Sequence, residues 1–170
     1  MVVTLGWQDL AVMRGGTPAT VALDRAQVSY TLHSYAHDSR AGSFGEEAAA
    51  LLGVDPHRIF KTLIAAVDNR LVCAVVPVAS RLNLKALASA AGGRRAELAD
   101  PARAQRATGY VLGGISPLGH KSAIPVLIDS SVTGLATVFV SAGKRGLQVE
   151  LAPAALLRLT GGSTAPLATA

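Results

Sequence analysis

The chain has 170 residues, half of them apolar and 16% charged, as expected of one ordinary folded domain. A domain of this size buries roughly 70% of its extended-chain surface, which excludes disorder as its main state. Sixteen lysines and arginines against eleven acidic residues give a net charge of +5, which favours a polyanionic partner such as a nucleic acid.

A single cysteine, Cys73, excludes an internal disulfide and fits a reducing, cytoplasmic setting. Its neighbours are apolar, so we interpret the thiol as buried and inert. No basic segment followed by an apolar run opens the chain, and we therefore expect no signal peptide. The apolar run from Leu71 to Ala79 is too short to span a bilayer, so no association with a membrane is expected.

The two ends of the chain differ in composition from its body. Residues 1–16 have no clear hydrophobic period, so we predict a loose extension in which Met13 offers an alternative start. Residues 161–170 consist largely of Gly, Ser, Thr, Ala and Pro, and we predict a flexible tail there. One folded domain is then expected over 17–160.

The first half of this body alternates helices and strands. Thr17-Pro18 predicts a helix to about residue 27, because a capping residue followed by proline is typical of a helix start. A strand is expected over 29–35. Ser43-Phe44-Gly45-Glu46 fits a capping box, so a second helix is expected to run to Gly53. Two apolar strands over 59–67 and 71–78 form a predicted hairpin.

The second half continues the alternation. Asn83 and Asp100-Pro101 each predict the start of a short helix, and Pro153 predicts the start of a last one. Apolar stretches predict strands over 110–112, 124–128, 135–141 and 147–151. The order of elements predicts an α/β (α+β) domain, with a mixed, partly barrel-like β-sheet flanked by short helices.

Lys61 lies inside the apolar strand predicted over 59–67. A lysine in such surroundings costs free energy unless its ammonium group reaches water or an anion. Two interpretations remain open from the residues alone. Lys61 is either a lysine of an edge strand that extends to solvent, or an anion hook for a phosphate or a polarised ester carbonyl.

Two glycine-containing segments have equally open interpretations. Gly113-Gly114-Ile115-Ser116-Pro117-Leu118-Gly119 permits unusual backbone angles, and it is either a structural turn or a source of N–H donors for an oxyanion. Ser141-Ala142-Gly143-Lys144-Arg145-Gly146 follows an apolar stretch with two adjacent cations, and it is either a phosphate-binding turn or a solvated hairpin tip.

Several common kinds of active site are not predicted. The four histidines, His33, His37, His57 and His120, do not form a metal-ligand pattern with cysteines or spaced acids, so we expect no metal. No nucleophile elbow or metalloprotease helix is present, and we expect no cofactor. A protein nucleophile is therefore not evident in the sequence.

Taken together, these segments resemble the YbaK/EbsC family, the free-standing relatives of the editing domain inserted in bacterial prolyl-tRNA synthetases. The resemblance runs from about Thr17 to Leu159 and is specific through the joint order of its blocks. The blocks are Thr17-Pro18-Ala19, Leu32-His33-Ser34-Tyr35, Phe44-Gly45-Glu46-Glu47-Ala48, Phe60-Lys61-Thr62-Leu63, Leu82-Asn83-Leu84-Lys85, Ala104-Gln105-Arg106-Ala107-Thr108-Gly109-Tyr110, the segment Gly113 to Gly119, and Val140 to Leu147.

The resemblance implies the editing-domain fold and a set of site residues. Lys61, Gly113 and Gly114 would be catalytic, with the loop from Gly113 to Pro117 covering the acyl group. The residues implied to bind the substrate are Tyr35, Phe44, Thr62, Ile115, Ser116, Pro117, Ser141 and Gln148. Lys144 and Arg145 would bind tRNA phosphates. Gln148 departs from the family pattern, because some members have an aspartate in this strand.

The activity implied is deacylation of mischarged cysteinyl-tRNA(Pro), and of cysteinyl-tRNA(Cys), in which the cysteine thiol of the substrate attacks its own ester. The partners implied are aminoacyl-tRNA and prolyl-tRNA synthetase. Two alternatives stay open. One is hydrolysis by water of other small aminoacyl-tRNAs such as alanyl-tRNA(Pro). The other is a module that binds tRNA or a synthetase without catalysis.

Overall fold

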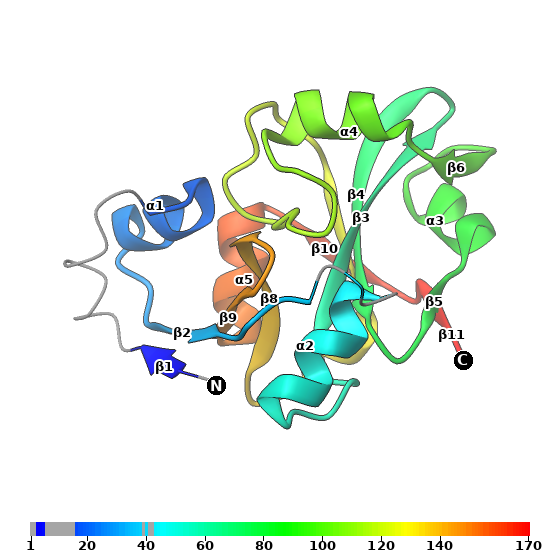
Figure 1. Ribbon diagram of the computed structural model, residues 1–170. Coiled ribbons are helices and arrows are strands. Elements are labelled where there is room, and N and C mark those ends of the chain that lie inside the picture. Colours follow the sequence, from blue (N-terminus) through cyan, green and yellow to red (C-terminus); the bar gives the residue numbers. More distant parts are fainter. Residues whose placement is uncertain (1–2, 6–15, 39, 41–42) are drawn as a thin grey trace.

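The computed structural model describes residues 3–5, 16–38, 40 and 43–170 (Figure 1). The α-helices are α1 (Pro18–Arg25), α2 (Phe44–Leu52), α3 (Leu84–Ala90), α4 (Pro101–Thr108) and α5 (Pro153–Thr160), with a 3-10 helix η2 (Ser130–Gly134). The strands are β1 (Val3–Leu5), β2 (Tyr30–Ser34), β3 (Phe60–Val67), β4 (Arg70–Pro77), β5 (Arg81–Leu82), β6 (Ala96–Leu98), β7 (Val126–Asp129), β8 (Val138–Lys144), β9 (Leu147–Leu151), β10 (Ser163–Ala165) and β11 (Ala168–Thr169).

The described strands form three open sheets. The largest has the order β10-β7-β4-β3-β6 and is mixed, because β7 runs parallel to both β4 and β10 while β3 is antiparallel to its neighbours. The second, β1-β2-β9-β8, is antiparallel, and β11 pairs with β5 in a third. The mixed α/β class is confirmed, but the partly barrel-like closure is wrong for the described strands. A single bridge, between Ile59 and Phe139, joins the two large sheets.

The core lies on both faces of the five-stranded sheet. Between the two large sheets, Phe60 and Ile64 of β3 pack with Val140 and Val149 of β8 and β9. On the other face, the alternate residues of β3 and β4 pack against α3, where Leu87 is fully buried. The side chains of β3 therefore alternate between two apolar layers, as the period of two requires in a central strand.

The local signals in the sequence place the helices correctly. Four of the helices have the predicted N-cap. In each, the side-chain oxygen of the capping residue accepts a hydrogen bond from the backbone N–H three residues later in the chain; the capping residues are Thr17, Ser43, Asn83 and Asp100. The hairpin of β3 and β4 turns at Asp68 and Asn69, both at positive φ, which is the conformation of a two-residue hairpin turn. All five predicted helices and this hairpin are confirmed.

Three predictions outside these signals need correction. Residues 110–112 do not form a strand but lead irregularly into a turn at 112–113, and the Tyr110 hydroxyl donates to Leu118 O at 2.6 Å, which holds the following loop. The predicted flexible tail at 161–170 is ordered: β10 and β11 pair with other strands, and Leu167 is fully buried. Within the predicted loose extension, Val3–Leu5 pair with β2, while Met13 and the rest of that segment up to residue 15 lie outside the described residues.

The helices of the described part are short. None of them combines the length and the hydrophobicity that crossing a lipid bilayer requires.

Candidate active site

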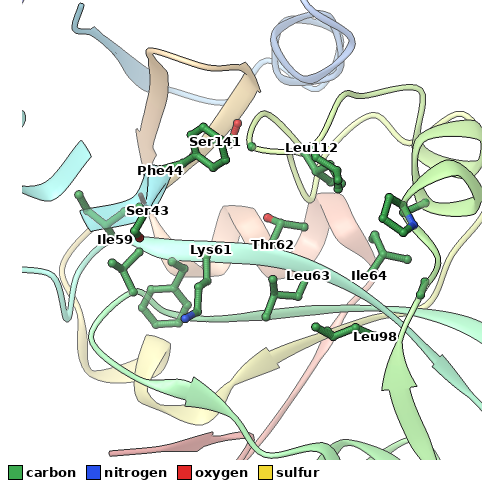
Figure 2. Close-up of a pocket in the computed structure, with 18 of the residues that line it drawn as sticks. Ser43, Phe44, Ile59, Lys61, Thr62, Leu63, Ile64, Leu98, Leu112 and Ser141 are labelled. Carbon is green, nitrogen blue, oxygen red and sulfur yellow. The ribbon is translucent and has the colours of Figure 1, made fainter. Parts of the chain in front are cut away.

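A cavity of about 430 Å³ opens between the start of α2, the first half of β3, the segment from β6 to α4, the glycine loop and the β8–β9 pair. Figure 2 shows that its residues come from both faces of β3. The residues that line it are Ser43, Phe44, Gly45, Ile59, Phe60, Lys61, Thr62, Leu63, Ile64, Val78, Leu98, Ala99, Pro101, Ala104, Leu112, Gly113, Ile115, Ser141 and Gln148.

Lys61 is the only acidic or basic residue among the described residues that line this cavity. Its side chain lies on the face of β3 that also carries Leu63, whereas Thr62 points toward Ser141 and Leu112 (Figure 2). The Lys61 ammonium donates to Ser80 O at 2.8 Å. Burial lowers the pKa of this ammonium; the charge of Glu46 opposes this shift, and that of Arg81 adds to it. Two of its three N–H groups remain for an anion.

Two residues that line this cavity each carry a buried polar atom without a hydrogen-bond partner in the described part of the chain. These atoms are Oγ1 of Thr62 and Oε1 of Gln148. Gln148 is only 8% exposed, and an unpaired polar atom at such a depth is costly unless a ligand or water satisfies it. A polar ligand group in the cavity would remove that cost.

Tyr35 interacts with the Gln148 side chain and does not line the cavity. It is buried, and burial raises the pKa of its hydroxyl, an effect that the neighbouring Gln148 side chain partly offsets. Its backbone N–H donates to Gly146 O at 2.9 Å, which ties the end of β2 to the turn before β9. Tyr35 therefore supports the cavity through Gln148 and does not contact a ligand there directly.

The glycine loop closes the cavity by close packing. Gly113 has a φ of +84°, and a Cβ atom there would lie 2.7 Å from Phe44 Cε2 and 2.8 Å from Arg145 Nε. At Gly114 a Cβ atom would lie 2.9 Å from Lys144 Cα. Neither position has room for a side chain, which explains the adjacent glycines.

The expected oxyanion role of the loop is wrong at Gly114. Its N–H donates to Val111 O at 3.0 Å, and Gly114 does not line the cavity. Ser116 and Pro117 are also buried within the loop and away from the cavity wall. The Ser116 hydroxyl accepts from Leu118 N–H at 3.2 Å, so it stabilises the loop internally.

Arg145 connects three elements around the cavity. Its guanidinium carbon lies 4.7 Å from the centroid of the Phe44 ring at the start of α2. Its Nε and Nη2 both donate to Leu112 O, at 3.0 and 2.7 Å. A cation over an aromatic face and a two-pronged hydrogen bond fix an arginine in one geometry. Arg145 therefore holds the glycine loop against α2.

The structure brings together seven of the predicted site residues on the cavity wall, and these are Phe44, Lys61, Thr62, Gly113, Ile115, Ser141 and Gln148. The predicted residues away from the wall are Tyr35, Gly114, Ser116, Pro117, Lys144 and Arg145.

Sequence reasoning missed the apolar mouth of the cavity. Leu98 and Leu112 line it and are 58% and 40% exposed, and Val111 beside them is 57% exposed. The only sequence signal for these residues was that they are apolar among polar neighbours. The strand β6 has three residues, which is too few to show an alternating hydrophobic pattern. Ser43 also lines the wall, although its sequence signal was that of a helix cap.

The described wall of the cavity lacks an activated protein nucleophile. The hydroxyls on the described wall belong to Ser43, Thr62 and Ser141, and no histidine or carboxylate lines the cavity beside them. Cys73 is fully buried, and burial raises the pKa of its thiol well above the usual range. The cavity can bind, orient and polarise a ligand, but it offers no base to activate a serine.

Comparison with known families gives a match over this whole region. Residues 40–159 match the model of the aminoacyl-tRNA editing domain. EbsC of Enterococcus faecalis, which is named as a Cys-tRNA(Pro)/Cys-tRNA(Cys) deacylase, is 38% identical over 155 residues, covering 90% of this chain and 93% of EbsC. A proline–tRNA ligase of Moorella thermoacetica is 34% identical over 100 residues, covering 59% of this chain and 17% of the ligase.

Solved structures share the fold. A hypothetical protein 26% identical in sequence superposes with a TM-score of 0.80, covering 89% of this chain and 99% of that protein. A protein described as a trans-editing enzyme for prolyl-tRNA synthetase superposes with a TM-score of 0.78 at 24% identity, covering 90% of this chain and 96% of that one.

Proposed function

Because the chain belongs to the aminoacyl-tRNA editing domain family, we propose that it is a deacylase that releases the amino acid from mischarged tRNA. Cysteinyl-tRNA(Pro) is the substrate that the site supports best, with cysteinyl-tRNA(Cys) as a second substrate, as in the name of the Enterococcus faecalis relative. The observation that carries this proposal is a cavity with one cation and two unpaired buried polar atoms, and with no activated nucleophile on its described wall.

The missing nucleophile is supplied by the substrate. The cysteine thiol loses its proton and attacks its own ester carbonyl; a carbon–sulfur bond forms, and the bond to the ribose oxygen breaks. The ribose oxygen takes up a proton, and the cysteine leaves as a cyclic thiolactone. A sulfur held beside the ester has a large effective molarity, which contributes up to roughly 7–11 kcal/mol in well-aligned cases. The protein then needs only to position the acyl end and to stabilise charge.

The residues on the wall divide this work. Lys61 binds the terminal phosphate or an ester oxygen through its remaining N–H groups. Gly113 and Ile115 shape the roof over the acyl group, and Phe44 and Ser141 line its sides. Thr62 Oγ1 and Gln148 Oε1 receive the polar groups of the amino acid. Gln148 is a neutral acceptor, so it holds an amino group by a hydrogen bond and not by a charge pair.

Binding of the tRNA body depends on surface cations, since the cavity accommodates only the acylated end. Lys144 and Arg145 lie beside the roof and are both exposed, and they contact the phosphates nearest the acyl end. We place the protein in the cytoplasm, where aminoacyl-tRNA is made, and prolyl-tRNA synthetase is the partner that supplies the mischarged tRNA.

The test is a deacylation assay of cysteinyl-tRNA(Pro) with the wild-type protein and with Lys61→Ala. Removing a charged donor from the site is expected to lower the rate by about 10²-fold or more, the usual cost of losing one such group. Lys85→Ala is the matched control, because Lys85 is an exposed lysine of α3 outside the cavity. Equal rates for wild type and Lys61→Ala would contradict the role of Lys61.

The same tRNA charged with serine or alanine tests the chemistry. Self-attack requires the thiol, so both of these substrates are expected to remain acylated. Rapid release of alanine would favour hydrolysis by water instead. Binding of tRNA without release of any of the three amino acids would identify a non-catalytic tRNA-binding module.

A further inference from the structure

The first half of β3 has an interrupted strand pairing on the edge that borders the cavity. On its other edge β3 pairs with β4 over its whole length, from Phe60 to Val67. On the cavity edge, the bridge between Ile59 and Phe139 precedes the gap, and the pairing with β6 resumes only at Ala65. All five residues from Phe60 to Ile64 line the cavity. The cavity therefore occupies a gap in the sheet.

The hydrogen bonds at both ends of the gap identify which main-chain groups face it. Ile64 O accepts from Ala99 N–H at 2.9 Å on the cavity edge, and Arg58 O accepts from Phe139 N–H at 2.9 Å on the same edge. Ile59 O, in contrast, accepts from Val78 N–H at 2.8 Å on the β4 edge. Main-chain groups alternate between the two edges of a strand, so the even-numbered residues face the cavity. Thr62 thus presents its N–H and C=O to the gap.

A single strand residue with both groups free is complementary to one amino acid. In an antiparallel hydrogen-bonded pair, two opposite residues exchange two N–H···O bonds. An aminoacyl group carries the same two functions, an α-amino donor and an acyl carbonyl acceptor. The unpaired Thr62 Oγ1 independently indicates that the ligand here is polar.

We propose that the open edge of β3 at Thr62 is a one-residue slot for the main chain of the aminoacyl group. The inference rests on the proposed deacylase function and deepens it. Thr62 N–H donates to the acyl carbonyl, where negative charge develops during attack, and Thr62 C=O accepts from the α-amino group. The main chain at Thr62 thereby takes over the oxyanion role that Gly114 cannot perform, because the Gly114 N–H is bound to Val111 O.

The antiparallel pairing also fixes the direction of the substrate. The ester oxygen and the ribose point toward the Phe60 end of the gap, opposite Lys61, where the free N–H groups of the ammonium can reach a phosphate. The amino-acid side chain lies on the same face as the Thr62 side chain, since directly opposite residues share a face. Ile64 lies on that face, Thr62 points toward Ser141 there, and Gln148 is a further residue of the cavity wall.

The slot is closed at the amino end of the substrate. Ala99 N–H already occupies Ile64 O, the next acceptor along this edge, and Leu98 pairs with Ala65 beyond it. A second amino acid attached to the α-amino group would lie opposite Leu63, between the slot and the position opposite Ile64 that Ala99 already fills. The slot consequently selects aminoacyl-tRNA and rejects peptidyl-tRNA, whatever the side chain.

Two experiments on the full chain test the slot. In the first, the residue at Thr62 is replaced by its α-hydroxy analogue, which exchanges the main-chain N–H for oxygen and leaves the side chain in place. Loss of an oxyanion donor is expected to lower the single-turnover rate on cysteinyl-tRNA(Pro) by about 10²-fold. The same exchange at Ile64 is the control, because its N–H lies on the same edge but does not bond to the substrate in this arrangement. It is expected to lower the single-turnover rate by less than about threefold.

In the second, wild-type protein is given N-acetylcysteinyl-tRNA(Pro), which keeps the thiol and the ester. Its release is expected to be slower than that of cysteine by about 10²-fold. Equal rates for the two main-chain variants, or equal rates for the two substrates, would overturn the slot while leaving the deacylase function intact. Failure of the wild type on cysteinyl-tRNA(Pro) would instead overturn the function. Unfolding midpoints of both variants identify any loss caused by misfolding.

Discussion

At the scale of single residues, the roof of the cavity depends on a glycine that cannot be replaced and an arginine that does not act as a simple surface charge. Gly113 is left-handed and lies against Phe44 and Arg145. Arg145 in turn donates twice to Leu112 O. The contact among these residues joins the loop, α2 and the β8–β9 turn, which are far apart in the sequence. The shape of the acyl site is therefore sensitive to changes that leave Lys61 untouched.

Gly113→Ala is expected to displace the roof. The added Cβ atom meets Phe44 Cε2 at 2.7 Å, and the φ of +84° is unfavourable for alanine, so we expect a loss of roughly 1–3 kcal/mol in the free energy of unfolding. Deacylation is expected to fall at least tenfold. Urea unfolding and kcat/KM measure the two effects. Gly134→Ala is the control, because a Cβ atom there meets nothing within 4 Å; similar losses in both variants would contradict the prediction.

Arg145→Met and Lys144→Met remove one charge each, but only the first removes the hydrogen bonds to Leu112 O. Both variants are expected to weaken tRNA binding to a similar extent. Arg145→Met alone is expected to lower the rate with bound substrate, by about tenfold for two partly exposed hydrogen bonds. Single-turnover rates at saturating protein, together with binding curves, separate the two effects. If Lys144→Met slows the bound-state reaction equally, Arg145 does not hold the roof.

At the scale of elements, the cavity exists because two strands separate. Among the described residues, β8 pairs with this edge only through the bridge from Phe139 to Ile59, just before β3, and β6 pairs with β3 only from Ala65 onward. The intervening edge of β3 is left for a ligand. The C-terminal strands stabilise the other side of the same sheet, since β10 extends it beside β7 and the Asp129 carboxylate accepts from Leu167 N–H at 2.8 Å.

Leu167→Ala tests whether this C-terminal segment is part of the folded unit. The side chain is fully buried in the cluster under α3, so its loss is expected to lower the free energy of unfolding by about 2–5 kcal/mol. Leu51→Ala on α2, where the side chain is 45% exposed, is expected to cost less than about 0.5 kcal/mol. Urea unfolding followed by circular dichroism compares the two. A negligible effect at Leu167 would mean that the segment is flexible after all.

At the scale of the whole molecule, the only protein thiol is separated from the chemistry by the core. Cys73 lies in the layer between the two large sheets and is fully buried. If the substrate supplies the reacting sulfur, the activity must be independent of this thiol. The same burial makes Cys73 a reporter of global unfolding.

Native protein is expected to resist a thiol-alkylating reagent at neutral pH, because both burial and the raised pKa of Cys73 suppress the thiolate. In urea, the fraction labelled should rise with the unfolding transition measured by circular dichroism. Deacylation should survive prolonged exposure of the native protein to the reagent. Rapid native labelling with loss of activity would place the protein thiol in the reaction.

The sequence by itself determined the local structure of this protein and the identity of its family. Caps such as Thr17, Ser43 and Asn83, and the turn at Asp68 and Asn69, specify their elements through contacts within a few residues, so they can be recognised without a fold. The expected function came from the order of the motifs around Lys61 and Gly113, because that order identifies the family, whereas composition does not identify an activity.

Only the tertiary structure decided what each site residue does. Whether Arg145 bonds to Leu112 O, and whether residues 161–170 are ordered, depends on partners far away in the chain. The gap in pairing along β3 also depends on distant residues. Whether an edge of β3 is paired is decided by strands that come later in the sequence, here β6 and β8. Hydrogen-bond pairing is a property of neighbours in space, and local pattern does not contain it.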